Sequence, residues 1–420
     1  MTPLRLSLSN LRHKLARTLI AVAGVTFAVT LIFMEIGMYG GIKRTATMLY
    51  DGLQFDLLVA SQEYIDLSRP GEVSRARVVQ ARSIDGVADV TPLSVGFGGW
   101  RQPSSKGTFG GFQPPGAIQS IYIVAAPPSR LKDIFTHGKG RVFESDAHAL
   151  AAGTELARLD TFLIDKLSVA SLGKYEDLRD IPPDGRSVGD KGDRDAVRLN
   201  ERRAEVVGTF RVGTGFSWNG MLMCSEETFQ RFTRRPDDLV NFALVRIAVT
   251  PDKPDYTAER DRVKAALEHK LPRDVQVFTA AAIKAKEQGF WVDITSVGQF
   301  IQVAVVLAIV VGVIFVYQMM AADIRNMLPE YATVKALGYR PVYLTRVVLW
   351  QAILLAAFGY VPGLVVSFGL FWVAKNFGGI PTEMTVGIAG TVLALTCTMC
   401  LVSGVLAVRK VHSADPADLF

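Results

Sequence analysis

The sequence predicts an α-helical membrane protein with four transmembrane helices and a large external α/β domain between the first and the second. Two observations predict this fold class. Four apolar stretches, each longer than the roughly 20 residues that cross a bilayer, contain a single acid or base between them, Glu35. The region between the first two stretches, residues 40–294, carries ordinary charge and patterns typical of both strands and helices. This division excludes a simple soluble enzyme and a fully embedded bundle alike.

The overall composition is an average over the apolar stretches and the polar region between the first two of them. The chain has 420 residues, of which 20% are charged, whereas a soluble globular protein carries about 25%. We expect membrane spans at residues 18–39, 295–320, 347–374 and 385–408. Residues 1–17 precede the first span, and Leu4, Leu8, Leu11 and Leu15 recur there on one helical face. This spacing predicts an amphipathic helix on the inner leaflet, and a plain basic flank is the alternative.

Basic residues indicate the orientation of the spans. The N-terminal segment, the loop at 321–346 and the tail at 409–420 are rich in Lys and Arg, whereas the short loop at 375–384 has only Lys375. The positive-inside rule then places both termini in the cytoplasm and residues 40–294 outside. The net charge of +6 is explained by this orientation. No dense basic run with interleaved aromatic residues is present, so we expect no nucleic-acid partner.

Polar and helix-breaking residues inside the spans are candidates for function. A carboxylate within a membrane is costly, but Glu35 lies four residues from the outer end of its span and can reach water. Packing against Gln299 or Gln302 and a role in proton coupling are the alternatives. Pro362 and Gly363 fall in the middle of the third span, where proline predicts a kink.

The external domain has two similar blocks at its ends. A strand, a helix and a strand are expected at residues 55–60, 73–84 and 87–92, and again at 242–249, 254–271 and 274–279. Two such units separated by a long insert predict ferredoxin-like halves, with an inserted, mostly-β subdomain at about 126–238. Its strands are expected at 204–211 and 220–224. Glycine- and proline-rich loops are expected at 96–116 and 182–195.

Motifs for enzymatic chemistry are absent from the sequence. It contains no G-x-x-x-x-G-K-[ST] phosphate loop, no H-E-x-x-H and no G-x-S-x-G. Glu144, Asp146 and His148 would share one face of a strand and could bind a metal, but a solvated loop is the preferred interpretation. Cys397 and Cys400 have the spacing of a redox motif, yet within an apolar helix they are expected to be packing residues.

The cytoplasmic loop carries the pattern of a short helix. Pro329 suits a first helical turn, Glu330 follows at the positive end of the helix dipole, and Gly338 is a natural stop. A short rigid helix between two spans can dock in a partner's groove and transmit force. The alternative is a simple turn, although a turn needs only about 2–8 residues.

These features together resemble the FtsX-like permeases, the membrane subunits of MacB-type ABC transporters. The run EYATVKALGY at 330–339 is similar to the family's coupling-helix signature, and GRVF at 140–143, VVGTF at 206–210 and DPA at 415–417 are similar to other family segments. The family's basic-basic-Glu start is replaced here by NMLP at 326–329. The residues of this run look closest to those of the DevC-like subgroup. The resemblance assigns ATPase coupling to Pro329, Glu330, Tyr331, Thr333, Lys335, Leu337 and Gly338.

The resemblance also implies partners and location. It implies a bacterial inner-membrane transporter subunit that is not itself an enzyme and has no cofactor, with ATP and Mg²⁺ bound by a separate cytoplasmic ATPase. Two copies of the chain, a periplasmic membrane-fusion adaptor, an outer-membrane channel and membrane lipids are the further expected partners. The cargo would be a lipid, a glycolipid or another envelope substrate. A membrane-anchored ligand-binding protein for signalling or adhesion, without an ATPase, is the main alternative; a membrane-anchored hydrolase is the other.

Overall fold

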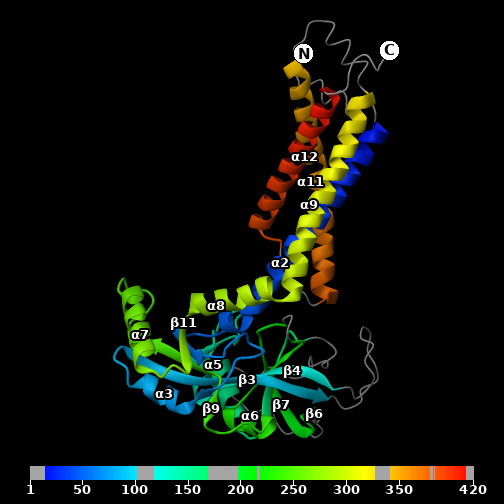
Figure 1. Ribbon diagram of the computed structural model, residues 1–420. Coiled ribbons are helices and arrows are strands. Elements are labelled where there is room, and N and C mark those ends of the chain that lie inside the picture. The colour runs from blue at the N-terminus through cyan, green and yellow to red at the C-terminus, as the bar shows by residue number, and fades with distance from the viewer. Residues whose placement is uncertain are drawn as a thin grey trace. The chain divides into compact units, whose positions relative to one another are not determined.

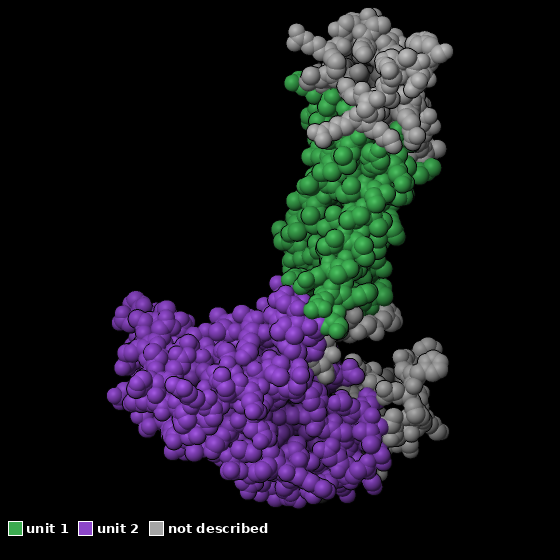
Figure 2. Space-filling model, viewed as in Figure 1, with its two compact units in different colours: residues 1–41, 296–420 green, residues 42–295 purple. Residues whose placement is uncertain are grey.

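The chain is seen here in a computed structural model that describes residues 15–101, 118–168, 197–214, 218–326, 341–378, 382 and 384–412. It divides into two compact units, drawn in different colours in Figure 2. One unit consists of Met1–Gly41 and Ser296–Phe420, and the other of Ile42–Thr295. Each unit is described by itself below.

The first unit contains helices that are long and apolar enough to cross a membrane, which confirms the four predicted spans. They pack around a shared apolar core of small and branched side chains. The first helix runs on to Gly52, well past the end expected at residue 39, because Ile42, Ala46 and Leu49 continue one apolar face that is buried. The helices are α2 (Leu15–Gly52), α9 (Ser296–Asn326), α11 (Pro341–Gly378) and α12 (Val386–His412) (Figure 1).

One half of the second unit is an antiparallel four-stranded sheet with the order β11-β1-β10-β3. Helices α3 and α7 bury their apolar faces against it. This order, with a helix after the first and third strands, is the ferredoxin-like arrangement that the two sequence blocks predict. The elements are β1 (Leu57–Ser61), α3 (Arg75–Arg82), β3 (Val87–Arg101), β10 (Phe242–Ile247), α7 (Tyr256–Lys270) and β11 (Val275–Thr279).

Strand β3 is longer than expected and joins the two halves of this unit. The sequence suggested a loop from residue 96, but the strand continues to Arg101. The glycines there serve close packing rather than a turn. A Cβ atom at Gly98 would lie 2.7 Å from Leu199 and 2.8 Å from Ile123, so a side chain would not fit. The first part of β3 pairs with β10 and the second part with β4.

The inserted half forms a closed ring of strands. The order β3-β4-β8-β5-β7-β6 returns to its start because β6 pairs with the end of β3. The boundary between the halves therefore lies inside β3, ahead of residue 126. The insert strands are β4 (Gln119–Ala125), β5 (Thr161–Asp165), β6 (Val197–Leu199), β7 (Arg202–Phe210) and β8 (Met221–Cys224).

The insert also contains helices, including α4 (Leu131–Ile134), α5 (Asp146–Leu156) and α6 (Glu226–Thr233), so it is mixed rather than mostly β. Ser145 caps the N-terminus of α5. Asp146 and His148 therefore lie on a helix, and the prediction of a solvated loop at these two residues is wrong. His148 is buried against Phe143. Among the described residues, no group of three acidic, histidine or cysteine side chains could hold a metal.

The chain returns from β11 toward α9 through two short helical segments. Thr279 caps α8 (Ala280–Gly289) by accepting a hydrogen bond from the amide of Ala282. One turn of π-helix, η3 (Phe290–Ile294), follows directly and ends two residues before α9. π-helical turns are rare and are frequent at functional sites. The two segments that connect the external unit to the first and second spans are thus the end of α2 and α8–η3.

Candidate functional site

The residues expected to couple to an ATPase lie outside the described part of the chain. These are Pro329, Glu330, Tyr331, Thr333, Lys335, Leu337 and Gly338. Their role stays a prediction from the sequence. The predicted N-terminal amphipathic helix, the loop at 182–195 and the tail from residue 413 also lie outside it.

The two polar residues singled out inside the spans have different surroundings. Glu35 is half-buried on α2, and the described residues offer it no hydrogen bond or ion pair. Gln302 lies on an exposed face of α9. No polar partner of Glu35 is found among the described residues, and the three interpretations of its role stay predictions.

Gly363 has a packing role that the sequence interpretation missed. Helix α11 is continuous through Pro362, and the kink expected there stays a prediction. A Cβ atom at Gly363 would lie 2.7 Å from Cγ1 of Val29 on α2, and one at Gly359 would overlap Val25. The Thr26 hydroxyl donates a hydrogen bond of 3.2 Å to the Gly359 carbonyl. Gly359 and Gly363 thus form a small-x-x-x-small face that lets the first and third spans approach closely.

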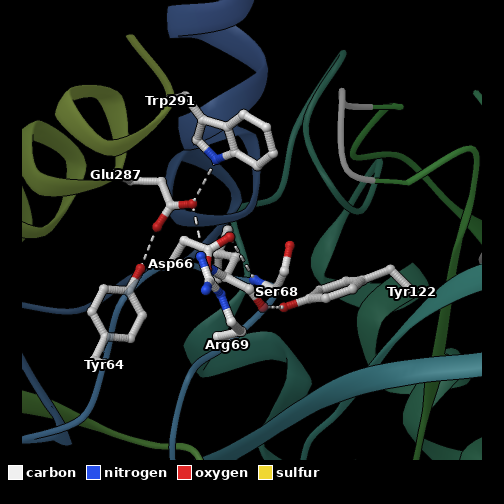
Figure 3. Close-up of polar contacts among 8 residues, drawn as sticks. Tyr64, Asp66, Ser68, Arg69, Tyr122, Glu287 and Trp291 are labelled. Atoms are coloured by element: carbon white, nitrogen blue, oxygen red, sulfur yellow. Dashed lines mark hydrogen bonds and ion pairs between the residues drawn. The ribbon is translucent and has the colours of Figure 1, made fainter. Parts of the chain in front are cut away.

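A buried polar cluster of the external unit surrounds Glu287, on the last turn of α8 (Figure 3). Its side chain is completely buried. One carboxylate oxygen accepts hydrogen bonds from the Leu67 amide at 3.2 Å and from the Trp291 indole at 3.1 Å, and the other accepts one from the Tyr64 hydroxyl. Three donors from two distant parts of the chain thus converge on one carboxyl group.

The cluster continues from Tyr64 to the end of the first helix. The hydroxyl groups of Tyr64 and Tyr50 lie 2.8 Å apart, and Tyr50 is a buried residue of α2. Two further contacts join α8 to the same end of α2: Lys284 forms an ion pair of 2.6 Å with Asp51, and the Gln288 amide donates to the Lys43 carbonyl at 3.2 Å. We call this set of contacts between α2, the loop after β1 and α8–η3 the junction.

The loop after β1 is itself held in place on both sides. While the Leu67 amide donates to Glu287, the Leu67 carbonyl accepts a hydrogen bond of 2.8 Å from Tyr122 on β4. Asp66 is buried and pairs with Arg69 at 3.2 Å. These contacts fix the backbone from which Tyr64 and Leu67 donate to Glu287, so both donors are held in place by contacts other than those to the carboxyl group.

The electrostatics of the junction favour the neutral form of the Glu287 carboxyl group. Burial raises the pKa of Glu287 to about 7, and hydrogen bonds from Tyr64, Leu67 and Trp291 offset only part of that rise. The nearby Asp66 carboxylate raises it further. Lys286 points its ammonium at the rings of Phe278 and Tyr64, 4.9 and 5.2 Å from their centroids. The charge on Glu287 is therefore held by hydrogen bonds rather than by an ion pair.

Taken together, the fold defines a multi-span membrane protein whose large α/β unit is inserted in the sequence between the first two spans. Residues 303–416 match the family model of the FtsX-like permease C-terminal domain, and this part of the chain is therefore an FtsX-like permease domain. The resemblance read from the sequence is confirmed for this family, and the DevC-like subgroup stays a prediction.

Two solved structures are similar to this chain. The extracellular domain of the noncanonic ABC-type transporter YknZ from Gram-positive bacteria has 14% identity and a TM-score of 0.30, and covers 54% of this chain and 100% of its own. The periplasmic region of MacB from Actinobacillus actinomycetemcomitans has 11% identity and a TM-score of 0.31, and covers 55% of this chain and 92% of its own. A search of the curated proteins gives no significant match.

Proposed function

We propose that this chain is the permease subunit of an ATP-driven ABC exporter, and that it relays the motion of an ATPase to its external domain. The observation that carries this proposal is the match of the last three spans to the FtsX-like permease domain. The 420 residues contain no phosphate-binding loop, and in this proposal ATP and Mg²⁺ are bound by a separate cytoplasmic ATPase.

The cytoplasmic loop would be the point of contact with that ATPase. The sequence from Pro329 to Gly338 has the pattern expected of a capped helix, and Glu330 and Lys335 would offer both charges to a docking groove. A paired ATPase presents two grooves, so two copies of this chain would assemble with it. The basic residues of the same loop support the orientation in which both termini are cytoplasmic and the external unit is periplasmic.

The external domain would work against periplasmic partners. A membrane-fusion adaptor and an outer-membrane channel would complete a path for a lipid, a glycolipid or another envelope substrate. In this arrangement the cargo need not pass between the spans, because the external domain can drive it by moving. The inner membrane of a bacterium is the location that fits these partners.

Association with the ATPase tests the proposal. Lys335→Glu and Gly338→Pro should abolish co-purification of a cytoplasmic ATPase while leaving membrane insertion intact, since one reverses a docking charge and the other breaks the helix end. Gly369→Ala is the matched control, because a Cβ atom there meets nothing within 4 Å. Co-purification that is unchanged in both loop variants would contradict the coupling assignment. A wild-type chain that brings down no ATPase would favour the ligand-binding alternative.

A further inference from the structure

The junction has the features of a device that depends on the charge of one residue. Among the described hydrogen bonds of the junction, only the carboxyl group of Glu287 accepts from three donors at once. Those donors come from the loop after β1 and from η3. Trp291 lies one turn after Glu287 and belongs to the π-helical turn that leads to α9. The same carboxyl group therefore fixes both the start of the segment entering the second span and the residues that contact the end of α2.

We propose that Glu287 is a positioning residue of the permease: its buried carboxyl group holds α8–η3 against the end of α2, tightly when the group is neutral and more loosely when it is charged. The hold itself follows from the geometry of the external unit. Its use as a relay between the spans and the external domain rests on the proposed function.

The loosening follows from burial of the charged form without an ion pair among the described residues. Lys286 interacts with the Glu287 charge, but its ammonium lies over the rings of Phe278 and Tyr64. Several titratable and charged groups lie on the elements packed around Glu287. They are Lys43, Arg44, Tyr50 and Asp51 at the end of α2, Glu63, Tyr64, Asp66, Arg69 and Glu72 in the loop, Tyr122 on β4, Lys284 and Lys286 on α8, and Asp293 on η3. Arg69 is engaged with Asp66 and Lys284 with Asp51. Asp66 adds a repulsive charge. An ionised carboxylate is thus favoured when the junction opens and water reaches it.

The neutral carboxyl group can keep every contact of the closed junction. Protonated at the oxygen that faces Tyr64, it donates to the Tyr64 hydroxyl, and Tyr64 then donates to Tyr50. The other oxygen still accepts from Leu67 and Trp291. A glutamine can reproduce this pattern with its amide group, whereas an alanine leaves Leu67 and Trp291 without their acceptor and Tyr64 without its donor. Glutamine and alanine should therefore have opposite effects.

Amide hydrogen exchange of the full-length chain in phospholipid nanodiscs tests this. The readout is the protection of residues 289–295, corrected for intrinsic exchange, between pH 5 and pH 8. The closed junction binds its proton with a pKa of about 7 and a hydrated carboxyl group with one of 4.5. Wild-type protection should fall by about 70-fold as pH rises from 5 to 8.

The variants separate a charge-dependent hold from a merely structural one. Glu287→Gln should give protection that does not change with pH and that exceeds wild type at pH 8. Glu287→Ala should lower protection at every pH. Lys284→Met, which removes the exposed ion pair between the same two helices, should keep the wild-type pH profile. Protection that falls equally in the Gln and Ala variants, or a wild-type profile without pH dependence, would overturn the proposal.

The experiment also separates this proposal from the permease assignment. It needs no ATPase, so a chain that binds none can still show the pH-dependent junction. Conversely, a chain that co-purifies with an ATPase but shows no pH dependence at residues 289–295 retains its function and loses only the role of Glu287.

Discussion

The two units of the molecule hold their helices together by opposite means. In the membrane unit, α2 and α11 approach through Gly359 and Gly363, and the contact is made by apolar atoms with one hydrogen bond from Thr26. In the external unit, the end of α2 and α8 are joined through the buried carboxyl group of Glu287 and two tyrosine hydroxyls. The first contact depends on shape and is insensitive to pH. The second depends on charge and can be switched.

The largest expected effect is on the contact that depends on shape. Gly359→Leu should lower the stability of the full-length protein in detergent by about 3 kcal/mol, because even the first added carbon overlaps Val25. Gly369→Leu adds the same side chain to the same helix in open space and should leave the unfolding temperature almost unchanged. Equal losses in the two variants would mean that the close approach of α2 and α11 is not the cause.

The next effect distinguishes the contact that depends on charge. The folded pKa of Glu287, about 7, lies above its ordinary value of 4.5, so the folded state holds the proton more tightly. Its contribution to stability is fully present below pH 4.5 and is lost as pH rises through 7, which amounts to about 3 kcal/mol before solvent penetration is allowed for. Burial also raises the pKa values of Asp165 and Glu226, so the difference between wild type and Glu287→Gln isolates the junction. A constant difference across this pH range would contradict the assignment.

A smaller effect is expected at the link between Glu287 and α2. Tyr64→Phe removes the hydroxyl that bonds both Glu287 and Tyr50 and should cost about 1.5 kcal/mol, since two buried groups each lose one partner. Chemical unfolding of the full chain measures this, with Val79→Ala as a control on an exposed side chain of α3. If Tyr64→Phe is neutral, the hydroxyl link is not what connects the loop to α2.

The smallest effect is expected at the surface of the junction. Lys284 and Asp51 are both solvent-accessible, with 32% and 51% of their side chains exposed. Lys284→Met should therefore change the free energy of unfolding by about 0.5 kcal/mol or less, and the change should disappear in high salt. A loss comparable to that of Tyr64→Phe would show that the ion pair, and not the buried carboxyl group, dominates the junction.

The sequence predicts the elements whose signal is local and misses the contacts whose partners are distant. The apolar stretches and the strand–helix–strand blocks at both ends of the external domain have periods that can be recognised within a few residues. The extension of β3 past Gly96 could not be foreseen, because glycines that pack against Leu199 look the same in sequence as glycines in a loop.

Glu287 was missed for a similar reason. It follows Lys286 in a polar helix and looks like a surface charge, while Leu67 and Tyr64 precede it by 220 and 223 residues. The one local feature beside it is Trp291, one turn later, and the spacing alone does not indicate a hydrogen bond. Gly363 was noticed for the neighbouring proline, although its spacing from Gly359 is the feature that the packing uses.

The central claim is that motion at the cytoplasmic loop reaches the junction. The most direct test is hydrogen exchange of residues 289–295 in the complex of this chain with its co-purified ATPase, compared between the nucleotide-free state and a state trapped with ATP and vanadate, with ATP hydrolysis measured in the same sample. We predict that trapping changes the exchange of this segment in the wild-type complex. In Gly338→Pro, where the contact with the ATPase is broken, nucleotide should leave it unchanged. A wild-type complex that hydrolyses ATP while exchange at residues 289–295 stays the same in both states would contradict the account.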